Sequence, residues 1–490
     1  MAMINLPEKA DAIRLRDFFV EFGYTEEGLK ESLGQATPPE EGALQAMLHR
    51  MRGANPGSAL ARLFLIGVDI EKDLGDAVLP KWFLALCLEH GLLQETTDLY
   101  RSNVVIVPVA DFLVASDAFR VLGTDEASEF VMPASTHSAD FLRRLIISKQ
   151  VDSTLDLGTG CGIHALFAST HSTQVVASDI SERAIRFAEF NALLNGRDNI
   201  ECVIGDRFSA VEGQSFDFIV SNPPFVLGPD DEYTYRDNKL ELDEFCRQLV
   251  EEAAGHLNEA GHLQMLCETV ELDGESWKDK MMEWTTSTGC DTWLLHSPPL
   301  RPPNYTAIRL ADIRGGETGP GQEAFDRWLN YFADKNVTGI HPGMIVLRRR
   351  EGANWFHIHD LASDLTDDAG DAVLRGIAAL DFLHAHDEEK ELLNAVLELS
   401  PFLTLEQQFS REEEQWQPQK SVLAMSDGML MEAEIDMPVM AFLNQMDGSR
   451  NLHECVSRFA EAIKADEKKI AGDFLPIIRM FVARGFLRAA

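Results

Sequence analysis

Residues 155–165 read LDLGTGCGIHA, and this stretch limits the possible folds more than any other part of the chain. A hydrophobic strand pattern runs directly into Gly158, Gly160 and Gly162, and an apolar helical pattern follows. Glycine reaches backbone conformations that other residues avoid, and it lets a ligand approach the backbone closely. A strand, a glycine-rich turn and a helix in this order are typical of an open α/β sheet that holds a polar ligand at a helix N-terminus.

Strand and helix patterns alternate through residues 131–360, which predicts a Rossmann-like, doubly wound α/β sheet. The amphipathic stretch 181–196, SERAIRFAEFNALLNG, is expected to be a helix with Ser181 as its N-cap. Residues 297–308, SPPLRPPNYTAI, are interpreted as a stiff proline-rich connection. The seven expected strands contain STLDLG, QVVASD, NIECVIGD, FDFIVSN, GHLQMLC, CDTWLLHS and GMIVLRRR.

Length and local pattern divide the chain into three expected domains. At 490 residues the chain is too long for one ordinary core. Residues 1–128 contain helical patterns followed by two extended apolar runs, which suggests a mostly helical, winged-helix-like domain. Residues 129–360 hold the α/β sheet. Residues 361–490 are expected to form an acidic, mostly helical domain of small α/β, winged-helix type.

The formal net charge is −37, and each expected domain is acidic. Affinity for nucleic acid depends on clustered Lys and Arg, so a long duplex or ribosomal RNA becomes a less favoured partner. Seven scattered cysteines without a CxxC pair fit a reducing compartment and indicate no zinc site. The chain contains no apolar run of membrane-spanning length and no signal pattern, so we expect a cytoplasmic protein without a membrane partner or a bound metal.

Three aspartates follow successive expected strands, where open α/β sheets bind their ligands. Asp156 lies two residues before the first glycine, where a carboxylate suits a ligand with an ammonium group. Asp179 can accept from two ribose hydroxyls, and Asp206 lies beside the expected adenine position. The segment from Gly160 to Ala165 also fits a loose dinucleotide fingerprint, so a nicotinamide dinucleotide is the competing cofactor. A pyrophosphate would be unfavourable beside the Asp156 carboxylate.

Residues 221–226, SNPPFV, follow the fourth expected strand. Pro223 and Pro224 have fixed φ and no backbone N–H, so they form a rigid corner whose carbonyls can point into a pocket. Asn222 adds a side-chain acceptor and Phe225 a flat apolar face. Together the four residues suit a planar methyl acceptor with an NH2 group, whose two hydrogens are accepted by Asn222 and by the Pro223 carbonyl. Such a nitrogen is a poor nucleophile, so alignment must supply much of the catalysis.

In this order, LDLGTGCG, ASD, GDRF and SNPPF resemble the motifs of class I S-adenosylmethionine-dependent methyltransferases of the NPP[F/Y] amino-methylating group. The resemblance covers about residues 130–350 and is greatest to HemK/PrmC-like release-factor glutamine methyltransferases. It implies S-adenosylmethionine as the cofactor and a glutamine amide of a protein, such as a translation factor, as the acceptor. Families with this corner also methylate guanine-N2 or adenine-N6, so an rRNA or tRNA base is the alternative acceptor.

The chain departs from the glutamine-modifying pattern at two places. Phe225 stands where a tyrosine is usual, and VMPASTHSADFL replaces a proline-arginine-proline-glutamate stretch. By the same resemblance this segment would close over the cofactor, with Ser135 and Thr136 reaching its carboxylate; the alternative is that they cap the next helix. The residues expected to bind the cofactor are Ser135, Thr136, Asp156, Gly158, Thr159, Gly160, Gly162, Asp179, Ile180, Asp206, Arg207 and Asn222, and the expected catalytic residues are Asn222, Pro223, Pro224 and Phe225.

Three weaker patterns remain. FLNQMDGSRNLHECV, near the C-terminus, resembles PqqD-like peptide-binding modules, which favours a protein or peptide partner. H-x-H-D occurs at 357–360 and 384–387; metal ligation is conceivable, but surface histidines are the favoured interpretation because no further ligand pattern joins them. Tyr233, Tyr235 and Arg236, after the proline corner, are candidates for substrate contact.

Overall fold

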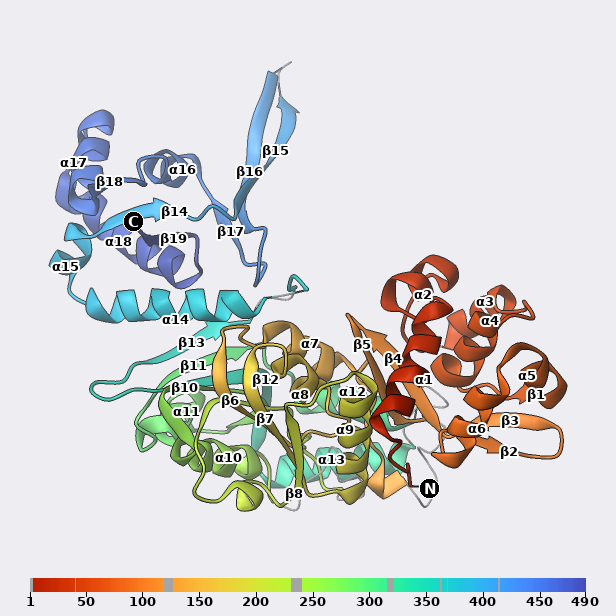
Figure 1. The fold of residues 1–490 in the computed structure, drawn as a ribbon. Helices are drawn as coiled ribbons and strands as arrows, with labels where there is room; N and C mark the ends of the chain where they lie inside the picture. The colour runs from red at the N-terminus through yellow and green to blue at the C-terminus, as the bar shows by residue number, and fades with distance from the viewer. Residues whose placement is uncertain are drawn as a thin grey trace. The chain divides into compact units, whose positions relative to one another are not determined.

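The computed structural model describes residues 3–39, 41–118, 127–230, 240–314, 321–361, 364–367, 369–412 and 415–490. The chain divides into two compact units (Figure 1). The first consists of Met1–Arg143 and Gln150–Ile358, and the second of Arg144–Lys149 and His359–Ala490. The segments expected as an N-terminal domain and as the α/β domain therefore belong to one compact unit.

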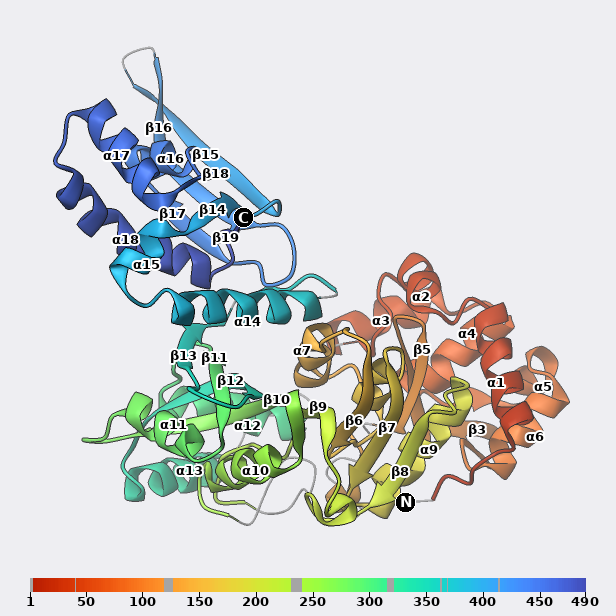
Figure 2. The same ribbon diagram turned by 60° about the vertical axis from the view of Figure 1, so that its left-hand side comes forward.

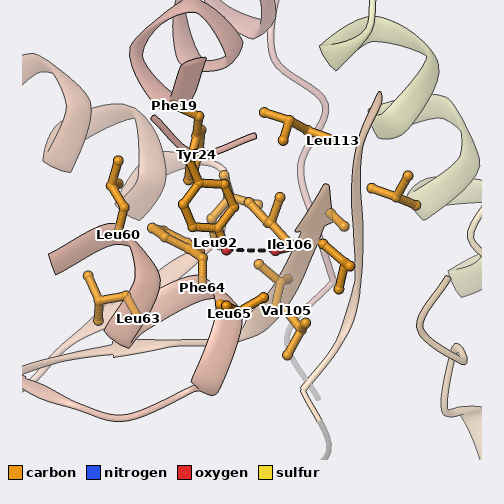
Figure 3. Close-up of a cluster of buried hydrophobic side chains, with 14 of the residues drawn as sticks. Phe19, Tyr24, Leu60, Leu63, Phe64, Leu65, Leu92, Val105, Ile106 and Leu113 are labelled. Atoms are coloured by element: carbon orange, nitrogen blue, oxygen red, sulfur yellow. Dashed lines mark hydrogen bonds between the residues drawn. The ribbon is translucent and has the colours of Figure 1, made fainter. Parts of the chain in front are cut away.

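The N-terminal part of the first unit is a helical layer around an aromatic core (Figure 3). The rings of Phe19, Phe64 and Phe83 meet edge to face, which is a favourable arrangement for aromatic side chains. Tyr24 is buried beside them, and its hydroxyl donates to the Ile106 carbonyl at 2.7 Å. The helices are α1 Lys9–Glu21, α2 Glu26–Leu33, α3 Glu41–Arg50, α4 Pro56–Leu60, the π-helical turn η1 Ala61–Ile66, α5 Lys72–Val78 and α6 Lys81–Glu89.

The two extended apolar runs expected near residue 110 are confirmed as an antiparallel hairpin. Val109 pairs with Phe112, and Ala110 in the turn has a φ of 49°. Every residue of both strands is buried, which explains why neither run shows polar alternation. The hairpin strands are β4 Val104–Val109 and β5 Phe112–Asp117, and a separate small sheet contains β1 Ile70–Glu71, β2 Leu93–Glu95 and β3 Leu99–Ser102.

A mixed sheet of eight strands forms the centre of the first unit, in the order β13-β11-β12-β10-β9-β6-β7-β8. β8, β7, β6, β9 and β10 are parallel neighbours, whereas β12 is antiparallel to both β10 and β11. All seven expected strands are present, and β13 adds an eighth at the edge. The strands are β6 Val151–Leu157, β7 Ser172–Asp179, β8 Ile200–Ile204, β9 Phe216–Ser221, β10 Leu257–Leu272, β11 Cys290–His296, β12 Val337–Arg349 and β13 Phe356–Asp360.

Helices cover both faces of this sheet, as a doubly wound fold requires. Val175 and Ala177 of β7 pack against α8, whereas Val176 between them belongs to the cluster that includes α10. Successive strand residues point to opposite faces, so α8 and α10 lie on opposite faces. Ser181 is the N-cap of α9, as expected, because its hydroxyl accepts from the Ala184 N–H at 3.3 Å. The helices are α7 His137–Leu145, α8 Ile163–Ala168, α9 Glu182–Leu194, α10 Glu244–Gly255, α11 Trp277–Thr286 and α13 Gln322–Asp334, with 3-10 turns η3 Ala127–Glu129 and η4 Ser209–Val211.

The interpretation of residues 297–308 as a proline-rich connection is wrong in its second half. Helix α12 spans Pro302–Arg314 and carries Tyr305 and Arg309. A proline is well tolerated in the first turn of a helix, because the N–H that it lacks would have no partner inside the helix. The prolines therefore mark the start of a helix here.

The second unit mixes helices and strands rather than being mostly helical, and β15 and β16 form a long hairpin (Figure 2). Asn451 begins α17 with a capping box, since its side chain accepts from the Glu454 N–H and Glu454 accepts from the Asn451 N–H. The elements are α14 Gly370–Ala385, α15 Glu389–Asn394, β14 Val396–Leu399, β15 Leu403–Glu412, β16 Gln415–Met425, β17 Glu432–Ile435, α16 Met437–Leu443, β18 Asp447–Asn451, α17 Leu452–Ile463, α18 Glu467–Ala483 and β19 Leu487–Ala489.

Candidate active site

A cavity of about 640 Å³ lies at the carboxyl ends of the parallel strands in the first unit. Parallel strands end at the same edge of a sheet, so the residues that follow β6, β7, β8 and β9 meet there. This volume is within the usual range for cavities that hold cofactors and small ligands. Twelve of the residues expected at the site line the cavity: Thr136, Gly158, Thr159, Gly160, Asp179, Ile180, Asp206, Arg207, Asn222, Pro223, Pro224 and Phe225. Ser135, Asp156 and Gly162 are not among its lining residues.

The three glycines after β6 have different environments. Gly158, Gly160 and Gly162 all have positive φ, at 72°, 55° and 81°. A Cβ atom at Gly158 or Gly160 would meet no protein atom within 4 Å, whereas at Gly162 it would lie 3.1 Å from Cα and Cβ of Ala188. The first two glycines therefore leave the backbone open at the cavity, and the third allows the loop to pack against α9.

Asp156 supports residues 158–162, called the glycine loop below, through its carboxylate. One carboxylate oxygen, Oδ2, accepts from the Thr159 hydroxyl at 2.6 Å and from the Ala165 N–H at 2.9 Å. The other, Oδ1, is buried and has no hydrogen-bond partner among the described residues. Burial raises the pKa of this carboxyl to about 6, and the two hydrogen bonds oppose that shift. The ammonium contact expected for Asp156 stays a prediction.

Asp179 links two neighbouring strand ends. Its Oδ2 accepts from the Gly160 N–H and its Oδ1 from the Ser181 N–H, both at 2.9 Å. Burial raises the pKa of Asp179, while these backbone donors favour the charged form. The carboxylate is thus held at the cavity by the glycine loop on one side and by the start of α9 on the other.

The residues after β8 lie at the cavity margin. The side chain of Asp206 is largely exposed, and Arg207 has a φ of 51°. The Arg207 guanidinium donates to Gln248 at 3.0 Å and forms an ion pair with Glu252 on α10. Arg207 therefore connects the end of β8 to α10, and its Nε also lies 4.0 Å from Asp206 Oδ1.

Residues 222–225, called the elbow below, line the same cavity as Gly158, Thr159 and Gly160. Asn222 Nδ2 lies 3.4 Å from the Ser138 hydroxyl on α7. The preceding residue, Ser221, donates from its hydroxyl to the Leu157 carbonyl at 2.8 Å, which joins β9 to β6. The Arg309 guanidinium lies 6.0 Å from the centre of the Phe225 ring. The elbow is thus flanked by α7 and α12.

The N-terminal hairpin supports the glycine loop through one buried side chain. Asn191 Nδ2 donates to the carbonyls of Ala115 and Cys161, both at 2.8 Å, and its Oδ1 accepts from the Ala115 N–H at 2.8 Å. Cys161 lies inside the glycine loop, so Asn191 connects this loop to β5. Burial raises the pKa of the Cys161 thiol to about 12, which is consistent with a packing role.

Several cavity residues have no motif in the sequence. Arg309 and Ile308 come from α12, which we interpreted in part as a connection. The proline at the start of that helix is the signal that could have revealed it. Tyr233, Tyr235 and Arg236 lie outside the described residues. Further lining residues that were not named as site residues include His164, Phe245 and Leu249. No group of three or more His, Cys, Asp or Glu side chains in the described part of the chain is arranged to hold a metal ion.

Two families match this chain. Residues 125–276 match the family described as methyltransferase small domain, and residues 374–489 match a domain of unknown function, DUF7782. The first match contains the glycine loop, the three aspartates and the elbow. The second lies in the second compact unit.

Similar proteins share only part of their length with this chain. A release factor glutamine methyltransferase of Xylella fastidiosa is 33% identical over 140 residues, which is 28% of this chain and 50% of that protein. A ribosomal protein uL3 glutamine methyltransferase of Xanthomonas campestris is 30% identical over 140 residues, which is 26% of this chain and 44% of that protein. The chain thus spans about half the length of these curated relatives.

Among solved structures, YcgJ protein from Bacillus subtilis is 17% identical, with 44% of this chain and 99% of that chain covered and a TM-score of 0.28. None of the described helices is both long enough and apolar enough to cross a membrane. The matched residues 125–276 contain the parallel strands β6 to β10 and all lining residues of the cavity except Ile308 and Arg309. Residues 125–276 therefore lie in a class I S-adenosylmethionine-dependent methyltransferase domain that is similar to the methyltransferase small domain family.

Proposed function

We propose that this protein is an N-methyltransferase that transfers a methyl group from S-adenosylmethionine to the side-chain amide of a protein glutamine. The observation that carries the proposal is the placement of the elbow and the glycine loop around one cavity. A donor held at the glycine loop and an NH2 group held at the elbow would then share the same enclosed space. Proximity of this kind can supply much of the rate enhancement for a weak nucleophile.

The residues of the cavity fit the proposed cofactor. Gly158 and Gly160 leave the loop backbone open, and the Asp179 carboxylate is suited to ribose hydroxyls. Asp206 lines the cavity and is suited to the adenine amine, whereas Asp156 lies outside the lining and supports Thr159 of the glycine loop. When bound, S-adenosylmethionine supplies an electrophilic methyl group.

The elbow would orient the acceptor. Asn222 and the Pro223 carbonyl would accept the two hydrogens of the amide NH2, and Phe225 would pack on its plane. With both hydrogens held in the amide plane, the nitrogen lone pair would be perpendicular to that plane, and its available lobe would lie on the face opposite Phe225. Pro223 and Pro224 restrict the backbone, so the two acceptors lose little conformational freedom when the substrate binds.

A protein acceptor is supported by two separate facts. The similar proteins from Xylella fastidiosa and Xanthomonas campestris are named as glutamine methyltransferases that act on a release factor and a ribosomal protein. The net charge of −37 is unfavourable for the phosphate contacts on which RNA affinity depends. We further propose three domains, 1–128, 129–360 and 361–490, of which the last would recruit the protein substrate through a peptide-binding surface.

Transfer of label from S-adenosylmethionine tests the proposed function. The protein is incubated with methyl-labelled cofactor and a ribosome-containing cell extract, and the product is divided between protease and ribonuclease digestion. We expect protease-sensitive label that yields N5-methylglutamine on complete enzymatic digestion. Label that only ribonuclease releases would instead establish the base-amine alternative and refute the protein acceptor.

Two variants make this experiment specific to the elbow. Asn222→Ala should lower transfer by about 100-fold or more, since loss of one oriented polar contact at a reacting group has effects of that size. Asn354→Ala is the matched control, because Asn354 is exposed and its side chain donates to the Arg350 carbonyl and to Asp291, none of which line the cavity. Equal transfer by Asn222→Ala and Asn354→Ala would refute the assigned role of the elbow.

A further inference from the structure

We propose that Tyr305, on α12, is a positioning residue that holds the elbow in the geometry needed to align the acceptor nitrogen. The inference deepens the proposed function and rests on it. The elbow is rigid within itself because of its two prolines, but its direction depends on what holds the chain on either side. The residues after the elbow are held by a buried network centred on Tyr305.

The Tyr305 hydroxyl makes the contact nearest to the elbow on its C-terminal side. It accepts a hydrogen bond from the Leu227 N–H at 2.8 Å and donates to Glu268 Oε2 on β10. Leu227 follows Phe225 by two residues and is buried. A buried backbone N–H needs a partner, and this hydroxyl provides it. The position of Leu227, and therefore the exit of the elbow, is fixed relative to the sheet.

Glu268 also holds Arg309, which lies near the Phe225 ring of the elbow. Its Oε1 forms an ion pair with Arg309, and the Arg309 guanidinium lies 6.0 Å from the Phe225 ring centre. A buried carboxylate is costly unless it is paired and hydrogen-bonded, and Glu268 satisfies both conditions with these two α12 side chains. The Glu268 carboxylate thus holds both Tyr305 and Arg309 in place beside the elbow.

The chain beyond Leu227 is anchored a second time. A Cβ atom at Gly228 would lie 2.7 Å from the Trp328 ring, so only glycine allows this close approach. Asp230 then accepts from the Trp328 indole N–H at 2.7 Å and from Arg327. Because residues 227–230 are held at both ends, a change at Tyr305 is expected to act locally on the elbow rather than on the whole loop.

Alignment of reacting groups is sensitive to displacements of a few tenths of an ångström. Tyr305→Phe removes only the hydroxyl and keeps the ring that contacts Phe332. Tyr24→Phe is the matched control, because Tyr24 is equally buried and also hydrogen-bonds a backbone group, the Ile106 carbonyl in the N-terminal core (Figure 3). Both variants lose a buried hydroxyl, but only one lies next to the elbow.

Hydrogen exchange measured by mass spectrometry on the full chain tests the structural link without any substrate. Tyr305→Phe should increase exchange in peptides that contain Leu227, and Tyr24→Phe should leave those peptides unchanged. Unchanged exchange at Leu227 in Tyr305→Phe would overturn the inference. Should Tyr305→Phe fail to fold, Arg309→Lys replaces it in the binding experiment below, with the same expected direction.

The second readout is calorimetry with two probes. One is S-adenosylhomocysteine, and the other is an adduct that joins the same nucleoside to a glutamine amide nitrogen. The wild-type protein should bind the adduct more tightly than S-adenosylhomocysteine. In Tyr305→Phe the affinity for the adduct should fall about 10-fold while that for S-adenosylhomocysteine stays within about 2-fold. Tyr24→Phe should change neither.

The two failures are distinguishable. If the wild-type protein binds the adduct no better than S-adenosylhomocysteine, the glutamine acceptor is refuted, whatever the hydrogen exchange shows. If the wild-type protein prefers the adduct and Tyr305→Phe keeps the full preference, the proposed function stands and the positioning role of Tyr305 is refuted.

Discussion

Arg183 of α9 and Asp117 of β5 form a buried ion pair between the N-terminal hairpin and the methyltransferase sheet. Arg183 Nε donates to Asp117 Oδ2 at 2.9 Å, and the same oxygen accepts from the Val131 N–H at 2.9 Å. Val131 lines the cavity. Asp117 therefore connects Arg183 of α9 to the cavity-lining residue Val131, and all three residues belong to the same compact unit.

Breaking this pair is expected to destabilise the whole first unit. Arg183→Leu leaves the Asp117 carboxylate buried without its charged partner, which should lower the free energy of unfolding by about 3–5 kcal/mol. Denaturant titration followed by circular dichroism measures this value. Lys9→Ala is the control, because the ion pair between Lys9 on α1 and Asp198 after α9 also joins the N-terminal part to the α/β part but is exposed. Equal losses in both variants would contradict the assigned importance of burial.

Asp179→Asn should weaken cofactor binding. The Gly160 and Ser181 N–H groups bond different oxygens of Asp179, so the NH2 group of an asparagine would face one of these donors, and the side chain would carry no charge for ribose hydroxyls. Hydrogen bonds to charged groups are worth about 1.5–3 kcal/mol, so the Kd for S-adenosylhomocysteine should rise about 10-fold or more. Calorimetry measures it. A Kd equal to that of the wild type would remove Asp179 from the cofactor site.

Gly162→Ala should destabilise the fold more than Gly213→Ala. Both glycines have positive φ, at 81° and 75°, so both substitutions pay a similar backbone penalty. Only at Gly162 would the new methyl group crowd Ala188 at 3.1 Å; at Gly213 it meets nothing within 4 Å. Overpacking of this kind costs about 1–3 kcal/mol, which should appear as the difference between the two variants in thermal or denaturant unfolding. A larger loss of stability in Gly213→Ala than in Gly162→Ala would show that α9 can shift to accommodate the extra methyl group.

Asp156 should give the stability a specific pH dependence. Its pKa is raised from 3.8 in the reference state to about 6 in the folded protein, so the folded state binds more protons between these values. Protonated Asp156 raises the free energy of unfolding by about 3 kcal/mol below pH 4. This contribution is lost as the pH rises through 6. Asp156→Asn removes this loss. We therefore expect the free energy of unfolding of the wild type, minus that of the variant, to fall as the pH is raised from 4 to 7. A difference that does not change with pH would contradict the raised pKa.

Local sequence pattern by itself determined most of the methyltransferase sheet and the position of its site. The strands before Gly158, Asp179, Asp206 and Asn222 show short apolar runs, and parallel strands end at one edge of a sheet. These two facts bring the candidate residues together without any knowledge of packing. The N-cap at Ser181 followed in the same way, because capping depends on a few neighbouring residues.

Only the tertiary structure decided what each of these residues contacts. Asp156 turns beneath the glycine loop, Gly162 packs against α9, and Tyr305 bonds to Leu227 across 78 positions of sequence. Helix α12 was obscured by its prolines, and the strand β13 was not anticipated at the edge of the sheet. Periodicity reports which face of an element is buried, whereas a contact between distant residues depends on how complete elements pack, and no local pattern encodes that.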